Sequence, residues 1–275
     1  MNLSRLLSPL HQLLAPVGQI CLACGRPMQT GDRHYPEVCR TCVAEIPWIR
    51  HPRCPRCGRH IGCPDCTRPG AFRRPFILNR SAVAYDSRMR EWLAQYKYRG
   101  REAYAPLLAR MMGQAYKTLA SEMAFAQRLG KPWRVDAVAY VPLSSQRLAE
   151  RGFNQAELLA SGAAAAARVP LIALLERARD TEKMSLKNRR QRLNDMRAVF
   201  RPLPEASDLL VSLLESRRDR DRRPDRQIRS PLRLLLVDDI YTTGSTAAYC
   251  TEGLLLAGEE AGIRLEVYSL TWARS

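Results

Sequence analysis

Apolar residues fall alternately into short strand-like runs and longer stretches with helical spacing over most of the chain. The strand-like runs cover residues 80–85, 134–143, 170–175, 232–237 and 264–271. The helical stretches cover residues 89–98, 104–119, 154–167 and about 244–257. Alternation of this kind predicts an α/β fold, in which a mainly parallel sheet is flanked by helices.

Two segments depart from this alternation. Residues 1–20 are mildly apolar but are interrupted by Arg5 and His11, so we expect a short amphipathic helix and not a signal peptide. Residues 216–230 have almost no apolar content, which indicates a disordered linker or a long surface insertion. Because the chain has no apolar run of roughly 18 residues, it is not expected to be an integral membrane protein. We expect it to be cytoplasmic.

Eight of the nine cysteines form four Cys-x-x-Cys pairs. These pairs are Cys21 with Cys24, Cys39 with Cys42, Cys54 with Cys57, and Cys63 with Cys66. Each pair can supply two of the four thiolates of a tetrahedral Zn²⁺ site. Gly25 and Gly58 follow two pairs directly, where such a turn often needs an unhindered backbone. We interpret the pairs as two structural zinc sites filled in chain order, although the spacing also allows interleaved pairing.

Other interpretations of the cysteines are less favoured. A secreted disulfide scaffold would not usually place its cysteines in two-residue-spaced pairs, and the pairs do not open a helix in a βαβ setting, as a redox motif would. Eight thiols leave no vacancy for a histidine ligand, so His34, His51 and His60 are assigned to the surface. We expect Cys250 to be a small buried apolar residue on its helix.

The predicted domains follow from these patterns. Residues 1–20 form the N-terminal helix, residues 21–75 form a double zinc ribbon, and residues 76–275 form the α/β domain, with the insertion at 216–230.

The net charge of the chain indicates which kinds of partner it could bind. The formal net charge is +17, and residues 21–75 contain ten arginines and four acidic residues. Such an excess favours nucleic acid, phosphate-rich ligands or acidic membrane surfaces. The alternative is that the arginines reflect a GC-rich genome, so charge alone decides nothing.

The segment after the strongest predicted strand carries the most specific chemistry. The strand ends in two adjacent carboxylates, Asp238 and Asp239, and a short polar turn then opens a helix. The turn consists of Thr242, Thr243, Gly244, Ser245 and Thr246. Its hydroxyls and backbone N–H groups, together with the positive helix N-terminus, are suited to a phosphate. In open α/β sheets such ligands lie at the carboxyl ends of the strands.

This strand–turn–helix segment resembles the signature of type I phosphoribosyltransferases, which bind phosphoribosyl pyrophosphate (PRPP). The resemblance implies that Asp238 and Asp239 hold the ribose hydroxyls and that residues 242–246 surround the 5′-phosphate, with Mg²⁺ accompanying PRPP. Purine-salvage relatives carry an additional aspartate at the position of Thr242. Its absence here argues against hypoxanthine or guanine as the acceptor.

Two further polar segments are candidates for the same site. Arg147 and Arg151 follow a predicted strand and could clamp pyrophosphate, although the segment that contains them could equally be a helix start capped by Asn154. Residues 177–190 could form either a mobile loop over PRPP or a solvated helix.

From Cys21 onward the chain resembles the ComF family, which joins a zinc ribbon to a phosphoribosyltransferase-like domain and is linked to natural transformation. The resemblance rests on the cysteine pairs and on residues 96–100, 151–155 and 237–244. Two departures are Met184, where the family usually carries glutamine, and the long insertion at 216–230. The resemblance implies a role with the DNA-uptake machinery at the inner face of the membrane.

Two functions remain open at this point. The protein could be a phosphoribosyltransferase with an unknown acceptor. Alternatively, it could be a non-catalytic protein that binds single-stranded DNA through arginines interleaved with Tyr35, Trp48 and Phe72, with a regulatory or vestigial PRPP site. Core packing of a small metal module is the more ordinary role for these aromatic residues.

Overall fold

The computed structural model describes residues 19–67, 74–98, 103–128, 130, 132–177, 199–221 and 230–275. The chain divides into two compact units, Met1–Ile46 and Pro47–Ser275. The cysteine-rich segment is therefore split between the units, since Cys21 to Cys42 lie in the first and Cys54 to Cys66 in the second. The predicted domain boundary at 75/76 stays a prediction.

The first unit contains a short antiparallel hairpin and one helix. Strand β1 (Gln19–Ile20) pairs with β2 (Pro27–Met28), and α2 (Arg40–Ala44) follows. Residues 1–18 of the predicted N-terminal helix lie outside the described residues. Gln19 and Ile20 are extended and not helical, because the hairpin continues into a bond from the Cys21 N–H to the Arg26 carbonyl at 2.9 Å.

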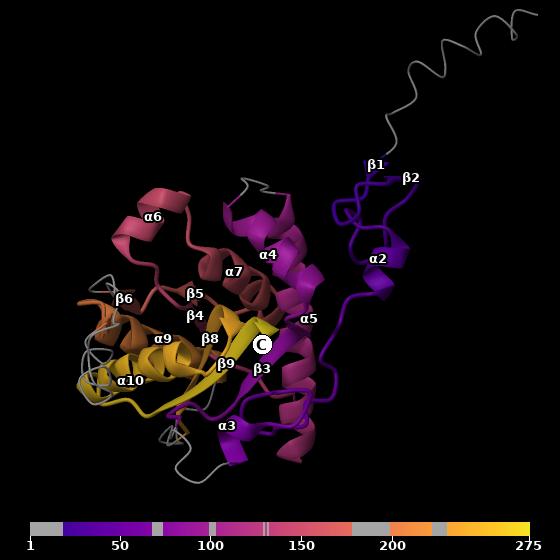
Figure 1. Cartoon of the computed structure of the whole chain (residues 1–275). Coiled ribbons are helices and arrows are strands. Elements are labelled where there is room, and N and C mark those ends of the chain that lie inside the picture. Colours follow the sequence, from indigo (N-terminus) through magenta and orange to yellow (C-terminus); the bar gives the residue numbers. More distant parts are fainter. Residues whose placement is uncertain are drawn as a thin grey trace, which may run out of the picture. The chain divides into compact units, whose positions relative to one another are not determined.

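The second unit carries the α/β fold (Figure 1). Its elements before the polar turn are α3 (Pro64–Thr67), β3 (Asn79–Ala84), α4 (Ser87–Tyr98), α5 (Tyr104–Ala126), β4 (Ala137–Tyr140), α6 (Ser145–Arg151), α7 (Gln155–Ala167), β5 (Leu171–Ile172), β6 (Leu175–Arg177), β7 (Phe200–Pro202), α9 (Ala206–Asp221) and β8 (Leu232–Tyr241). Helix α10 (Ser245–Glu260) and β9 (Leu265–Arg274) complete it.

The central sheet has five strands in the order β3-β9-β8-β4-β5, and every pairing within it is parallel. Strands β8 and β9 are its long central strands, and the apolar run at 232–237 is buried on both faces, as central parallel strands require. The predicted α/β fold with a parallel sheet and flanking helices is confirmed.

Helices cover both faces of this sheet (Figure 1). Leu232, Leu234 and Leu236 share one buried core with residues of α9 and α10. Because side chains alternate along a strand, Leu235 and Val237 face the other side, where α5 and α7 pack against the strands and against each other.

Some elements differ from their predicted form. Residues 170–175 form β5 and the start of a separate antiparallel pair, β6 with β7, instead of one strand. Helix α9 was not predicted, and it extends through Asp221, six residues into the segment interpreted as a linker. The Arg217 guanidinium stabilises this end by donating to the Asp136 carboxylate at 3.2 Å and to the Pro231 carbonyl at 3.0 Å. The segment at 222–229 lies outside the described residues, as do residues 178–190 of the predicted loop.

Among the helices of the described residues, none is long and apolar enough to cross a membrane.

Candidate metal centres and phosphate site

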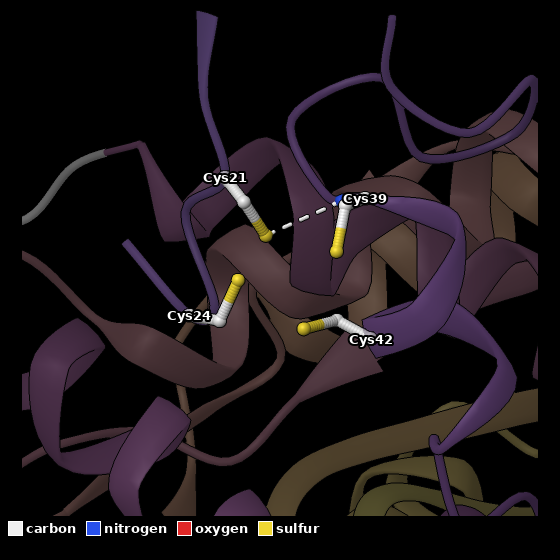
Figure 2. A group of neighbouring side chains, drawn as sticks. All are labelled: Cys21, Cys24, Cys39 and Cys42. Atoms are coloured by element: carbon white, nitrogen blue, oxygen red, sulfur yellow. Dashed lines mark hydrogen bonds between the residues drawn. The ribbon is translucent and has the colours of Figure 1, made fainter. Parts of the chain in front are cut away.

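The cysteines form two groups of four in chain order. Within each group the sulfurs lie within 4.8 Å of one another, one group comprising Cys21, Cys24, Cys39 and Cys42 and the other Cys54, Cys57, Cys63 and Cys66. The sulfurs of the first group point toward a common centre, and the Cys39 N–H donates to the Cys21 sulfur at 3.3 Å (Figure 2). The interleaved pairing is therefore not the one adopted.

The two groups use the same local turn. The Gly25 N–H donates to the Cys21 carbonyl at 2.8 Å, and the Gly58 N–H donates to the Cys54 carbonyl at 3.1 Å. Both glycines have positive φ angles, 70° and 72°, which a side chain would disfavour. This confirms the conformational role expected for them.

The donor sets suit Zn²⁺. Burial raises the pKa of Cys66 to about 12. Burial acts in the same direction at Cys57, but hydrogen bonds, first that from Arg274, lower its pKa to about 6. Four adjacent sulfurs cannot all ionise unless a cation lies among them, and a tetrahedral thiolate set is the preferred environment of structural zinc. Either group of four could hold one zinc ion.

The second group is built into the core of the α/β unit. Cys54 and Cys57 are buried in the same core as Phe76, Tyr241 and the sheet residues. The Asn79 side chain on β3 donates to the Cys57 carbonyl at 3.2 Å, and the buried Arg80 guanidinium donates to the Pro55 carbonyl at 3.0 Å. The turn that carries these cysteines is thereby bonded directly to an edge strand.

The polar turn after β8 forms an open helix N-terminus. Gly244 caps α10 with a φ of 85° and has no side chain to accept a hydrogen bond, and the Thr243 hydroxyl accepts from the Ser245 N–H at 3.4 Å. The Thr243 and Ser245 hydroxyls contact each other at 2.9 Å. Since the first N–H groups of a helix lack partners within the helix, this end offers donors and a positive dipole to an anion.

A recess opens at this helix end. It has an empty volume of about 230 Å³, part of it continuous with solvent. The predicted site residues that line it are Asp238, Thr242, Gly244, Ser245 and Thr246. Its other lining residues are Ile240, Tyr241, Ala247 and Thr271. One of the two predicted acids and four of the five turn residues therefore surround one small cavity.

The two acids have different surroundings. Burial and then the neighbouring Asp239 charge raise the pKa of Asp238 to about 8. Asp239 forms an ion pair with Lys97 of α4, and its N–H donates to the Asp238 carboxylate at 2.8 Å. Asp238 thus faces the recess as a carboxyl group whose ionisation is disfavoured, while Asp239 is neutralised by a lysine.

The predicted arginines are on a helix that follows β4. Arg147 and Arg151 are on α6, which Ser144 caps by accepting from the Arg147 N–H at 3.4 Å. The Arg151 guanidinium donates to the Gln155 side chain at 2.8 Å. Neither arginine is among the described residues that line the recess. Asn154 caps the following helix, α7, as the alternative interpretation of this segment expected.

Three basic residues around the turn were not selected from the sequence. Lys97 lies in the segment 96–100 that supports the ComF resemblance, so a closer reading of that segment could have found it. Arg74 and Arg274 donate to carbonyl groups of the turn. No local pattern marks them, because their role depends on long-range packing.

The burial of the remaining cysteine and of three histidines can be compared with the prediction. Cys250 is buried on α10, as predicted. His34 and His51 are exposed, whereas His60 is only half-buried, because it packs beside Arg59 and the second cysteine group.

The fold and the site together define an α/β protein with two four-cysteine groups and a strand–turn–helix recess suited to an anion. No family model matches the chain. It is 28% identical over 236 residues to competence protein ComFC of Bacillus subtilis (strain 168), covering 82% of this chain and 81% of that protein. It is 26% identical to competence protein ComFC of Streptococcus pneumoniae (strain ATCC BAA-255 / R6), covering 91% of this chain and 98% of that protein. It is also 26% identical to DNA utilization protein YhgH of Salmonella typhi, covering 87% of this chain and 92% of that protein.

These similarities extend over most of each chain. They support the assignment to the ComF family that was made from the sequence motifs.

Proposed function

We propose that the second unit binds PRPP at the carboxyl end of β8 and that the protein acts in DNA uptake. The observation that carries the binding proposal is the N-terminus of α10, which is headed by Gly244 and opens into a recess beside Asp238. The helix N–H groups and the hydroxyls of Ser245 and Thr246 would hold the 5′-phosphate. Asp238 would accept hydrogen bonds from the ribose hydroxyls.

The role of Asp239 in this proposal is indirect. Its ion pair with Lys97 keeps one negative charge of the acid pair compensated, so that Asp238 can approach the sugar without a second unpaired carboxylate beside it. Arg147 and Arg151 could reach the pyrophosphate only from α6, and their part in binding stays a prediction. Mg²⁺ would accompany PRPP through its phosphate oxygens.

The relatives supply the biological setting. Their names refer to competence and to DNA utilization, which supports a role for this chain in handling incoming DNA. We propose that it works in the cytoplasm with the DNA-uptake machinery at the inner face of the membrane. The two cysteine groups would carry structural zinc.

Isothermal titration calorimetry tests the binding proposal. Zinc-loaded protein should bind PRPP, and Asp238→Asn should weaken binding by about tenfold, because an NH₂ group replaces one of the two carboxyl oxygens that would accept from the ribose hydroxyls. Asp208→Asn is the matched control, since Asp208 is an exposed acid on α9. Titrations with ribose 5-phosphate and with and without Mg²⁺ separate the 5′-phosphate from the pyrophosphate. Wild-type protein that binds none of these ligands would refute the proposal.

Whether PRPP is also turned over is a separate question. An enzyme would release pyrophosphate from PRPP in the presence of a nitrogen nucleophile, through an oxocarbenium-like state that Asp238 and the phosphate ligands stabilise. Pyrophosphate release with a panel of bases and amines, abolished in Asp238→Asn, would establish a transferase. PRPP binding without release with any acceptor would favour a sensor.

A second candidate function is binding of single-stranded DNA, and the exposure of arginines around the cysteines favours it. These exposed residues are Arg26, Arg33, Arg40, Arg50, Arg53 and Arg56. The aromatic part of the hypothesis is weaker: Tyr35 is buried, Trp48 is half-buried, and Phe72 lies outside the described residues. Phosphate contacts would therefore dominate over base stacking.

Salt titration tests this second function. Neutralising Arg53 and Arg56 together should flatten the dependence of log affinity on log salt by roughly 0.7 for each phosphate that an arginine no longer neutralises. Arg218→Gln on α9 is the control, because Arg218 is exposed and lies far along the chain from the cysteines. Affinity that does not change with salt would exclude this mode of binding.

A further inference from the structure

We propose that the second cysteine group, Cys54, Cys57, Cys63 and Cys66, sets the geometry of the phosphate-binding turn through two buried arginines, Arg74 and Arg274. In this proposal the arginines are positioning residues that make PRPP affinity depend on the state of the metal centre. The inference rests on the proposed PRPP site, and it adds a regulatory input to that site.

Arg74 forms the first link. Its side chain is 5% exposed, and one guanidinium nitrogen donates to the Cys66 sulfur at 3.0 Å while another donates to the Thr243 carbonyl at 3.0 Å. A single planar group therefore joins a candidate zinc ligand to the turn. A Cβ atom on Gly244 would lie 3.1 Å from the Arg74 Nε, so the guanidinium also packs closely against the glycine that heads α10.

Arg274 forms the second link from the end of β9. It is 1% exposed and donates to the Tyr241 carbonyl at 3.2 Å and to the Thr242 carbonyl at 3.0 Å. Its other terminal nitrogen lies 3.6 Å from the Cys57 sulfur, and its charge stacks over the Tyr241 ring at 4.7 Å. Through Arg274, Cys57 is connected to the carbonyls of Tyr241 and Thr242, and through Arg74, Cys66 is connected to the next carbonyl, that of Thr243.

These bonds fix the direction of the turn amides. In a trans peptide unit the C=O and N–H groups point in opposite directions. Carbonyls of residues 241–243 that point at the arginines therefore direct the N–H groups of Thr242, Thr243 and Gly244 away from them. These are backbone donors of the turn that would meet a phosphate, so the arginines prearrange the anion site without touching the ligand.

The cysteine group holds the arginines, together with the Asp65 carboxylate, which lies 3.9 Å from Arg274. A buried guanidinium needs an anionic or hydrogen-bonding partner, and metal-bound thiolates accept such bonds as an outer coordination shell. Loss of the metal, or oxidation of the thiols, would change the charge that these two arginines face. We expect the carbonyls of the turn to be released and the affinity for PRPP to fall.

The test is a double-mutant cycle in the full-length, zinc-loaded chain. Cys66→His keeps a zinc-binding side chain but removes the sulfur that accepts from Arg74, and Arg74→Gln replaces the charged guanidinium, whose two terminal nitrogens make the bridge, by a shorter neutral amide. Cys24→His is the matched control, because it makes the same exchange in the first cysteine group. Zinc content, PRPP affinity and amide hydrogen exchange of residues 241–247 are measured for each variant, together with Arg74→Lys as the conservative replacement.

Each of the two single variants should weaken PRPP binding about tenfold and accelerate exchange in residues 241–247. The double variant should be no worse than either single one, since both break the same connection. Arg74→Lys should lose less affinity than Arg74→Gln, and Cys24→His should leave both readouts at wild-type values. Additive losses, about a hundredfold in the double variant, or unchanged exchange in both single variants would overturn the proposal.

The hydrogen-exchange readout separates this inference from the proposed function. If the wild-type protein does not bind PRPP, the proposed function fails, while faster exchange of the turn in Arg74→Gln and Cys66→His would still establish the connection. If PRPP binds but the turn is insensitive to both variants, the connection fails alone.

Discussion

The two cysteine groups have the same ligands and the same glycine-containing turn, yet they serve different parts of the molecule. A Cβ atom added to Gly25 would meet nothing within 4 Å, whereas one added to Gly58 would lie 2.6 Å from the Asn79 carbonyl of β3. The first group belongs to a small unit with little regular structure. The second lies in the core of the sheet, bonded to β3 and to the turn after β8. The same four-cysteine motif thus belongs to a small module in one place and is bonded to the proposed ligand site in another.

The largest expected difference between the groups is in stability. Cys57→Ser should lower the free energy of unfolding of the second unit by about 3 kcal/mol or more, because it opens a buried metal site within a hydrophobic core. Cys24→Ser should leave that unit unchanged. All four tryptophans, Trp48, Trp92, Trp133 and Trp272, lie in the second unit, so urea unfolding followed by tryptophan fluorescence reads this unit selectively. Equal losses in both variants would contradict the distinction.

The glycines give a matched test of packing. Gly58→Ala should cost about 2–4 kcal/mol, since it combines an unfavourable positive φ with a backbone collision. Gly25→Ala should cost about 1 kcal/mol in the first unit from the φ angle alone, and tryptophan fluorescence should not change. Zinc release to a chromogenic chelator monitors the first unit. Gly58→Ala with a wild-type urea midpoint would show that the second turn is not held against β3.

The acid pair predicts how pH acts on the second unit. The pKa of Asp238 is raised to about 8 from an ordinary value of 3.8, so the folded state binds more protons than the unfolded state between these values. Stability contributed by this group is therefore full at low pH and falls as pH rises from about 4 to 8. Asp238→Asn should remove this slope. Urea midpoints at several pH values, compared between wild type and variant, measure it, and parallel profiles would be inconsistent with the raised pKa.

The smallest effects separate buried from exposed arginines near the second group. Arg80→Gln should cost about 2 kcal/mol, because Arg80 is buried and pairs with Glu122 besides holding the Pro55 carbonyl. Arg59→Gln should cost less than about 1 kcal/mol, because its pair with Asp65, at 3.7 Å, is partly exposed. Urea unfolding of both variants provides the comparison. A larger loss for Arg59→Gln would reverse this ranking.

Local patterns were sufficient to predict most of the fold. Leu232 to Val237 is apolar except for Arg233 and ends at Asp238, and Gly244 marks the turn before a helix, so sequence alone placed the central strand and the helix after it. Helix α9 was not predicted, and its charged end depends on Arg217 reaching Asp136, a residue far away in the sequence.

The residues of the candidate site likewise fall into those that the local sequence predicts and those that depend on long-range packing. Asp238 and the turn residues are neighbours in the sequence, so their grouping in one recess followed from the strand–turn–helix pattern. Arg147 and Arg151 were included for their chemistry, but α6 places them outside the recess lining. Arg74 and Arg274 were missed because they reach the turn from distant parts of the chain. Arg74 comes from the segment before β3 and Arg274 from the end of β9, and no local spacing encodes this packing.

The most direct test of the PRPP site is a crystal structure of the zinc-loaded protein with PRPP. The account predicts the 5′-phosphate at the N-terminus of α10, against the amides of residues 243–246, with the ribose hydroxyls on Asp238 and with Arg74 still bonded to Cys66. A ligand bound elsewhere, or a sugar phosphate in the recess with Asp238 turned away from it, would contradict it.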